Sequence, residues 1–283
     1  MSPDAREQMR IAVFALPATL YLLVMFAVPL GSVILQSFTV NDGSAFSLAS
    51  YTKVLGTTLF RQVMWTTTQI AVGATLFSFV LAYPVAYFLS RKPAASRAVW
   101  MILILVPFWT SSLVKSFAFT IILGQSGVIN GALGHFGLGP LPLLFNRFGV
   151  MVGMSHFLVP FIVFPVLANL VAQPPELARA AEIMGAGKLR IFLRVTFPLS
   201  LPGVIAGALL AFILSLGFYI IPALLGSRKD MMLSNLIDFY ARELLDMQTA
   251  SVIAVILTLA AIIAAMLLSK VRGGGSILSE GDA

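Results

Sequence analysis

The chain has 283 residues, of which 59% are hydrophobic and only 10% are charged. Soluble domains carry about 25% charged residues, so this composition excludes a soluble protein and indicates one helical membrane domain. The lack of cysteine excludes disulfides and thiolate chemistry, and two histidines are too few for a histidine metal cluster. The net charge of +7 is scattered among apolar segments, which fits membrane topology better than nucleic-acid binding.

Long apolar segments follow one another along the chain, each with the roughly 20 residues that a membrane-spanning helix needs. The first comes after a polar start and is too long for the core of a signal peptide, so we expect it to be retained. The sequence predicts an all-α, polytopic membrane protein with about six spans, at 11–38, 62–90, 98–124, 147–172, 200–226 and 248–269.

The distribution of Lys and Arg predicts the orientation of these spans. Because their number is even, both termini lie on one side. Eleven of the 18 basic residues flank the spans on that side, six flank them on the other, and Lys115 lies within a span. The positive-inside rule therefore predicts cytoplasmic termini, with loop 91–97, RKPAASR, as the clearest marker. The glycine-rich tail 271–283 is expected to be flexible.

Three segments are expected on the outer side: 39–61, the Gly- and Pro-rich 125–146, and a partly helical re-entry at 227–247. Prolines interrupt most spans, and each removes a helical hydrogen bond. Most such breaks are interpreted as packing kinks, whereas a break can also line a translocation path. Pro107 is the best candidate for such a path. The predicted path residues are its neighbours Trp109, Thr110, Ser111, Ser112 and Lys115.

Lys115 is the one charged residue predicted deep within a span. A charge at that depth is a candidate functional residue. The alternatives are an ion pair with an acid from the outer segment or from a partner, and a lysine that snorkels to the membrane surface. An unpaired lysine would repel a polycation, so either Lys115 is paired or the substrate is not a simple polycation.

The segment 174–199 is the only long one predicted on the cytoplasmic side. Two prolines and Glu176 suit the start of a short helix with an apolar stripe, and Gly185 and Gly187 then break it. A second helical stretch follows, with basic residues on its other face. Such a pair of helices fits a groove of a soluble partner, or alternatively rests on the lipid interface.

This segment resembles the signature loop of permease subunits from binding-protein-dependent ATP-binding-cassette (ABC) importers. Their pattern reads E-A-A, three residues, G, nine residues, I, one residue, L-P. In this chain Arg179, Ala180 and Ala181 take the triplet, and the remaining positions fall on Gly185, Val195 and Phe197-Pro198 without a gap. Arg179 departs from the pattern, because the family has an acid there. Glu176 and Glu182 lie one helical turn to either side, and we expect Glu182 to make the acidic contact.

Other segments resemble the spermidine/putrescine subfamily of these permeases, at Phe108–Asn130, at 221–235 and from Ala49. The resemblance implies a type I ABC importer permease fold in the cell's inner membrane. It implies an ATPase dimer, a second homologous permease and an extracytoplasmic binding protein as partners, and alternating access as the mechanism. The implied substrate is a polyamine-like compound, or a related amine or amino-acid derivative. The implied ATPase-coupling residues are Glu176, Arg179, Ala180, Ala181, Glu182, Gly185, Val195 and Pro198.

The sequence predicts no catalytic or metal-binding residue. Gly185-Ala186-Gly187-Lys188 lacks the first glycine and the final Ser or Thr of a phosphate-binding loop, so ATP and Mg are expected on the partner subunits. The predicted spans contain no Asp or Glu, which disfavours an ion-coupled secondary transporter. A non-transporting scaffold is the other alternative, and the signature loop disfavours both. Gly203 and Gly207 suit close helix packing, within the subunit or against its partner.

Overall fold

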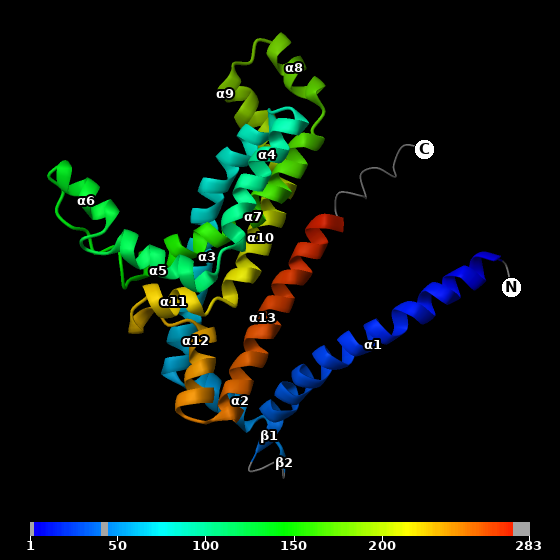
Figure 1. Ribbon diagram of the computed structural model, residues 1–283, viewed down its shortest axis with the longest axis vertical. Coiled ribbons are helices and arrows are strands. Elements are labelled where there is room, and N and C mark those ends of the chain that lie inside the picture. The colour runs from blue at the N-terminus through cyan, green and yellow to red at the C-terminus, as the bar shows by residue number, and fades with distance from the viewer. Residues whose placement is uncertain (1–2, 41–44, 274–283) are drawn as a thin grey trace. The chain divides into compact units, whose positions relative to one another are not determined.

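A computed structural model describes residues 3–40 and 45–273 (Figure 1). In these residues the chain is almost entirely helical, and six helical segments are long and apolar enough to cross a membrane. The long helices are α1 (Pro3–Phe38), α3 (Thr58–Ser90), α7 (Arg147–Ala172), α10 (Phe197–Leu216) and α13 (Met247–Gly273). The shorter helices are α2 (Ala49–Gly56), α4 (Ala94–Leu105), α5 (Ser112–Leu123), α6 (Val128–His135), α8 (Pro175–Ile183), α9 (Lys188–Ile191), α11 (Ile220–Leu225) and α12 (Leu233–Asp238).

Irregular helical turns connect several of these elements. Two are 3-10 turns, η1 (Val106–Trp109) and η3 (Arg228–Asp230), and two are π-helical, η2 (Phe192–Thr196) and η4 (Phe239–Glu243). The chain divides into two compact units, one made of Met1–Thr57 with Ile237–Ile256 and the other of Thr58–Leu236 with Leu257–Ala283. The candidate sites described below lie in the second unit.

In the first unit, a short antiparallel hairpin follows α1. Its strands β1 (Thr39–Val40) and β2 (Ala45–Phe46) pair Thr39 with Phe46. The hydroxyls of Ser37 and Tyr51 are 2.7 Å apart, and Gln248 at the start of α13 donates to the Thr39 carbonyl and to Ser50. These side-chain bonds hold α2 and the start of α13 against the hairpin.

The core of the second unit is formed by α3, α7 and α10, with α7 in contact with both others. Its fully buried residues include Ile70 of α3, Met154 and Ile162 of α7, and Ala211 of α10. The Tyr83 hydroxyl also lies 2.9 Å from that of Ser200, so α3 and α10 are joined by a buried hydrogen bond. Apolar burial on this scale is what makes the three helices one body.

The two glycines of the GxxxG pattern pack α10 against α7. A Cβ atom on Gly203 would lie 2.7 Å from the Pro165 carbonyl oxygen and from the Asn169 Cβ, and one on Gly207 would lie 3.0 Å from the Ile162 Cα. Of the two alternatives for this pattern, the structure therefore shows packing within the subunit.

Several helix bounds differ from the predicted ones. The segment 98–124 is not one helix, because α4 ends at Leu105 and α5 begins only at Ser112. The segment 200–226 is likewise broken, between α10 and α11. The helix that contains its first part begins at Lys188 instead of residue 200, because α9, η2 and α10 form one continuous helical run. Pro107 lacks the N–H that a continuous helix would need at the first break. At the second break, α10 is followed by Gly217, whose N–H closes the last turn on the Leu214 carbonyl.

Two segments outside the predicted spans contain helix. The outer segment 125–146 includes α6, and the Asn130 side chain closes the loop around it with hydrogen bonds to Gly124 and Leu141. The first three residues of the expected tail 271–283 belong to α13, and the rest of that tail lies outside the described residues.

Candidate functional site

The residues 174–199, which we call the α8–α9 hairpin, form the first candidate site. The hairpin extends beyond one end of α3, α7 and α10 (Figure 1). As predicted, it consists of a short helix, a glycine turn and a second helix. Pro175 and Glu176 occupy the first turn of α8. The first N–H groups of a helix have no partner within it, so proline costs no hydrogen bond there, and the positive end of the helix dipole favours the charge of Glu176.

The glycine turn ends α8 by a defined hydrogen-bond pattern. Ala186 N–H donates to the Ala181 carbonyl at 3.0 Å, and Gly185 N–H donates to the Glu182 carbonyl at 2.9 Å, which together make a Schellman motif. Gly185 has a φ of 81°, in the left-handed region that side chains disfavour. Gly187 has an ordinary extended backbone and precedes α9.

Apolar side chains at the tip of the hairpin are exposed. Ile183 is 87% exposed, Met184 81% and Leu189 71%, whereas Ala181 is the one buried residue of α8. A groove of about 620 Å³ follows the turn, lined by Leu189, Leu193 and the basic residues Lys188, Arg190 and Arg194. The tip therefore presents an apolar ridge beside positive charge.

The base of the hairpin is fixed to the membrane helices. Gln173 donates to the Thr196 carbonyl at 3.2 Å, which ties the end of α7 to η2. Phe192 of η2 packs edge-on against Tyr83 and Tyr87 of α3, with ring centroids 5.9 and 5.3 Å apart. The base of the hairpin is therefore in direct contact with both α3 and α7.

The predicted coupling residues fall into two groups. Glu176, Arg179, Ala180, Glu182, Gly185 and Pro198 are exposed, whereas Ala181 is buried and Val195 half-buried. In the described part of the chain, no ion pair involves Arg179 or Glu182. The two charges are thus both available to a partner.

The second candidate site is an aromatic cluster that joins the two helix breaks. We call Phe108, Phe157, Phe161 and Phe218 the break cluster. Phe108 lies in η1, Phe218 follows the end of α10, and Phe157 of α7 contacts both, at centroid distances of 5.1 Å each. Phe161 packs on Phe108 and on Phe157, at 5.6 Å from each.

Polar side chains satisfy the backbone at the second break. Ser234 donates to the Phe218 carbonyl, and Asn235 donates to the Tyr219 carbonyl at 3.0 Å. Both come from the re-entrant segment after η3. Irregular backbone is tolerated at membrane depth only where protein or a water-filled cavity satisfies it, and here the re-entrant segment does so in part.

The predicted path residues lie at the first break. Trp109, Thr110 and Ser111 are exposed, with Trp109 85% exposed, and Ser112 begins α5. Phe108 also lines an apolar cavity of about 470 Å³ together with Pro107 and His156.

Lys115 has an aromatic environment. Its Nζ lies 5.4 Å from the centroid of Phe157 and 5.9 Å from that of Phe108, both within the range of a cation–π contact. Among the described residues no carboxylate forms an ion pair with it. The predicted pairing with an acid of the outer segment is therefore not seen in the subunit.

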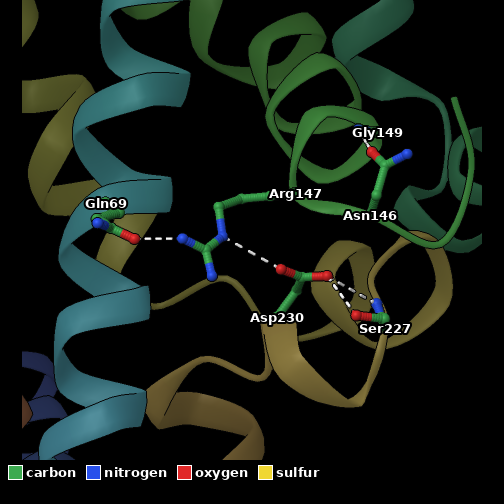
Figure 2. Close-up of polar contacts among 6 residues, drawn as sticks. All are labelled: Gln69, Asn146, Arg147, Gly149, Ser227 and Asp230. Atoms are coloured by element: carbon green, nitrogen blue, oxygen red, sulfur yellow. Dashed lines mark hydrogen bonds and ion pairs between the residues drawn. The ribbon is translucent and has the colours of Figure 1, made fainter.

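A polar network positions the re-entrant segment. Arg147, the first residue of α7, donates to Asp230 at 3.2 Å and to Gln69 of α3 (Figure 2). The buried Asp230 also accepts from the backbone N–H and the hydroxyl of Ser227, which makes a capping box. Gln69 lies about three turns into α3, so the network joins the middle of α3 to the start of α7 and to η3.

The sequence interpretation missed Asp230 as a structural acid. It placed this residue in the outer segment 227–247 and gave it no structural role. The Ser-x-x-Asp spacing of Ser227 and Asp230 is a signal for a capping box. Nothing local identifies Arg147 as the partner, because it lies 83 residues earlier.

Comparisons with known proteins agree with this arrangement. Residues 74–271 match the family described as binding-protein-dependent transport system inner membrane component. The chain is 32% identical over 245 residues to the spermidine/putrescine transport system permease protein PotB of Escherichia coli (strain K12), covering 84% of this chain and 89% of that protein. It is 30% identical over 224 residues to PotB of Haemophilus influenzae, covering 77% and 78%.

A solved structure shares the fold across nearly the whole chain. It is the crystal structure of a bacterial ABC transporter involved in the import of the acidic polysaccharide alginate, with a TM-score of 0.71 at 16% identity and 98% of both chains covered. At this identity the likeness shows the fold alone. Together with the family match and the relatives above 30% identity, it shows that the chain belongs to the family of inner membrane components of binding-protein-dependent transport systems and is a permease subunit of an ABC importer.

Proposed function

We infer that this permease imports polyamines or closely related small amines. The inference is supported by the two PotB relatives, which are named for spermidine and putrescine and match the chain over most of its length. The permease itself performs no bond chemistry in this proposal, and ATP with Mg is bound and hydrolysed by partner subunits.

The partner that hydrolyses ATP is an ATPase dimer that receives the α8–α9 hairpin. The observation that carries this proposal is the exposed apolar tip, Ile183, Met184 and Leu189, between basic and acidic side chains. A helical ridge of this kind fits a groove on a protein, with charges at the rim that set orientation. Glu182 directly precedes Ile183, and Lys188 directly precedes Leu189, so charges of both signs adjoin the exposed apolar side chains, which favours a protein groove over lipid.

The remaining partners follow from the type of importer. A second, homologous permease completes the path, and an extracytoplasmic binding protein delivers the solute. Both termini and the hairpin face the cytoplasm of the inner membrane, as the Lys and Arg distribution favours. A reporter fused near residue 95 or 186 should be cytoplasmic, and one near 135 or 236 should be outside.

The mechanism is alternating access driven by the ATPase. Closure of the ATPase dimer moves the tip of the hairpin. Because Phe192 packs on α3 and Gln173 ties η2 to α7, the movement reaches two of the three core helices, α3 and α7. Those helices carry Phe157 and Gln69, so the break cluster and the polar network are displaced together with them.

Reconstitution of the whole transporter tests the proposal. The tagged chain is purified with its co-purifying ATPase and second permease, placed in vesicles, and supplied with the binding protein. We expect ATP-dependent uptake of labelled spermidine or putrescine, no uptake of a neutral sugar, and no uptake with a hydrolysis-deficient ATPase. Uptake that persists without ATP would indicate a secondary carrier, and the absence of transport of any solute would indicate a scaffold.

A further inference from the structure

The ammonium of Lys115 is a cation bound by aromatic rings. Its Nζ faces Phe157 and Phe108 at 5.4 and 5.9 Å from the ring centroids, and Lys115 is half-buried. No acid in the described residues forms an ion pair with it. The electron-rich faces of the two rings are therefore the groups that stabilise this charge within the subunit.

The same two rings lie where both broken helices meet. Phe108 belongs to the break before α5, and Phe157 contacts Phe218 at the break after α10. In secondary transporters, solute sites are built at broken helices. The cation–π site likewise lies where two helices are broken, and it is occupied by a side chain of the protein.

The occupant has the same chemistry as the proposed substrate. Lys115 presents a primary ammonium on a flexible aliphatic chain, and polyamines carry primary ammonium groups on aliphatic chains. A pair of rings that holds the first can hold the second. Without a carboxylate the interaction is weak, which suits a transported solute that must leave again.

We propose that the faces of Phe108 and Phe157 bind an ammonium group of the transported amine, and that Lys115 occupies this site until the amine displaces it. The proposal rests on the proposed function and specifies where the amine binds. Lys115 then acts as a tethered competitor that keeps the site filled with a cation when no solute is present.

This proposal predicts opposite effects for the competitor and for the rings. Lys115→Gln removes both the competitor and its repulsion, so the amine should bind about 5-fold more tightly. Phe157→Leu removes a ring face, so the amine should bind about 5-fold more weakly. Lys115→Arg keeps a cation on the rings and should resemble the wild type.

Phe161→Leu is the matched control. Phe161 belongs to the same cluster and contacts both Phe108 and Phe157, yet it is not among the rings that Lys115 faces. Its replacement causes a similar loss of packing without removing an ammonium contact. A general effect of loosening the cluster would therefore appear equally in Phe157→Leu and Phe161→Leu.

The test measures binding of labelled spermidine to the purified permease–ATPase complex without binding protein. We expect tighter binding for Lys115→Gln, clearly weaker binding for Phe157→Leu, and a smaller loss for Phe161→Leu than for Phe157→Leu. Weaker or unchanged binding in Lys115→Gln, or equal losses in the two Phe variants, would overturn the proposal.

If the wild-type transporter imports spermidine while all variants bind it equally, the proposed amine site is wrong and the proposed function is retained. If the wild type neither binds nor imports an amine, the proposed function fails and the site falls with it.

Discussion

The α8–α9 hairpin and the break cluster are built in opposite ways. The hairpin is continuous in sequence, its turn is closed by bonds between neighbours, and its tip is exposed. The break cluster gathers Phe108, Phe157 and Phe218 from three separate segments around α7, beside a packed core. A substitution in the hairpin should therefore disturb a partner, whereas one in the core beneath the cluster should disturb the subunit itself.

The two regions should therefore respond in different measurements. Core substitutions should change the stability of the isolated subunit, and tip substitutions should change assembly with the ATPase and its coupling to transport. In the core, burial links each residue to the unfolding free energy. At an exposed tip, changes usually stay within about 0.5 kcal/mol of the original stability. The predictions below begin with the largest expected effect in the core and end with the smallest at the tip.

The largest effect is expected where α10 meets α7. Gly203→Ala places a Cβ 2.7 Å from the Pro165 carbonyl oxygen, so the helices must separate. We expect a loss of about 2–3 kcal/mol in unfolding free energy, measured by thermal unfolding in detergent. Gly131→Ala in α6 is the control, because no atom lies within 4 Å of its Cβ, and it should be neutral or slightly stabilising. Equal effects at both glycines would show that this packing is not what holds α10.

The polar network should come next. Asp230→Ala removes the partner of Arg147 and the cap on Ser227, and we expect a loss of about 2 kcal/mol. The loss is smaller than for a fully buried pair because the Arg147 side chain is 39% exposed. Asp238→Ala breaks the exposed pair with Arg242, whose side chain is 81% exposed, and should cost less than about 1 kcal/mol. If both variants unfold alike, Asp230 has no special role in positioning η3.

The glycine turn tests the hairpin with one substituent at two positions. Gly185→Ser forces a side chain into the left-handed region at a cost of about 1 kcal/mol, whereas Gly187→Ser keeps an extended backbone and adds a residue favoured before a helix. We expect Gly185→Ser to weaken co-purification of the ATPase about 5-fold, while the unfolding free energy of the subunit falls by no more than this ~1 kcal/mol. A larger fall in stability than in ATPase binding would contradict the separation between tip and core.

The smallest effect on stability is expected at the exposed acids of α8. Neither Glu176→Ala nor Glu182→Ala should change unfolding, since both side chains are exposed. Glu182→Ala should nevertheless lower the uptake obtained per ATP hydrolysed more than Glu176→Ala does, because Glu182 lies beside the tip and Glu176 is already satisfied at the helix start. Measuring both activities in vesicles decides this, and a larger defect in Glu176→Ala would move the acidic contact to the start of α8.

The sequence predicted the α8–α9 hairpin better than it predicted the two helix breaks of the break cluster. The positions of Pro174, Gly185 and the intervening apolar residues predicted the hairpin, because caps and turns depend on neighbours. Pro107 marked the first break, yet apolar composition alone predicted one span through 98–124, since hydropathy measures length and not hydrogen bonding. The second break, at Gly217, was missed for the same reason.

Composition, charge distribution and one loop pattern determined by themselves that this chain is an all-α membrane permease, because insertion into a bilayer depends on segment hydrophobicity and flanking charge. Only the tertiary structure decided which residues meet. It pairs Asp230 with Arg147, brings Lys115 to Phe108 and Phe157, and uses Gly203 between α7 and α10. Those contacts join residues far apart in the chain, and they depend on how the side chains of packed helices interlock, which no local pattern records.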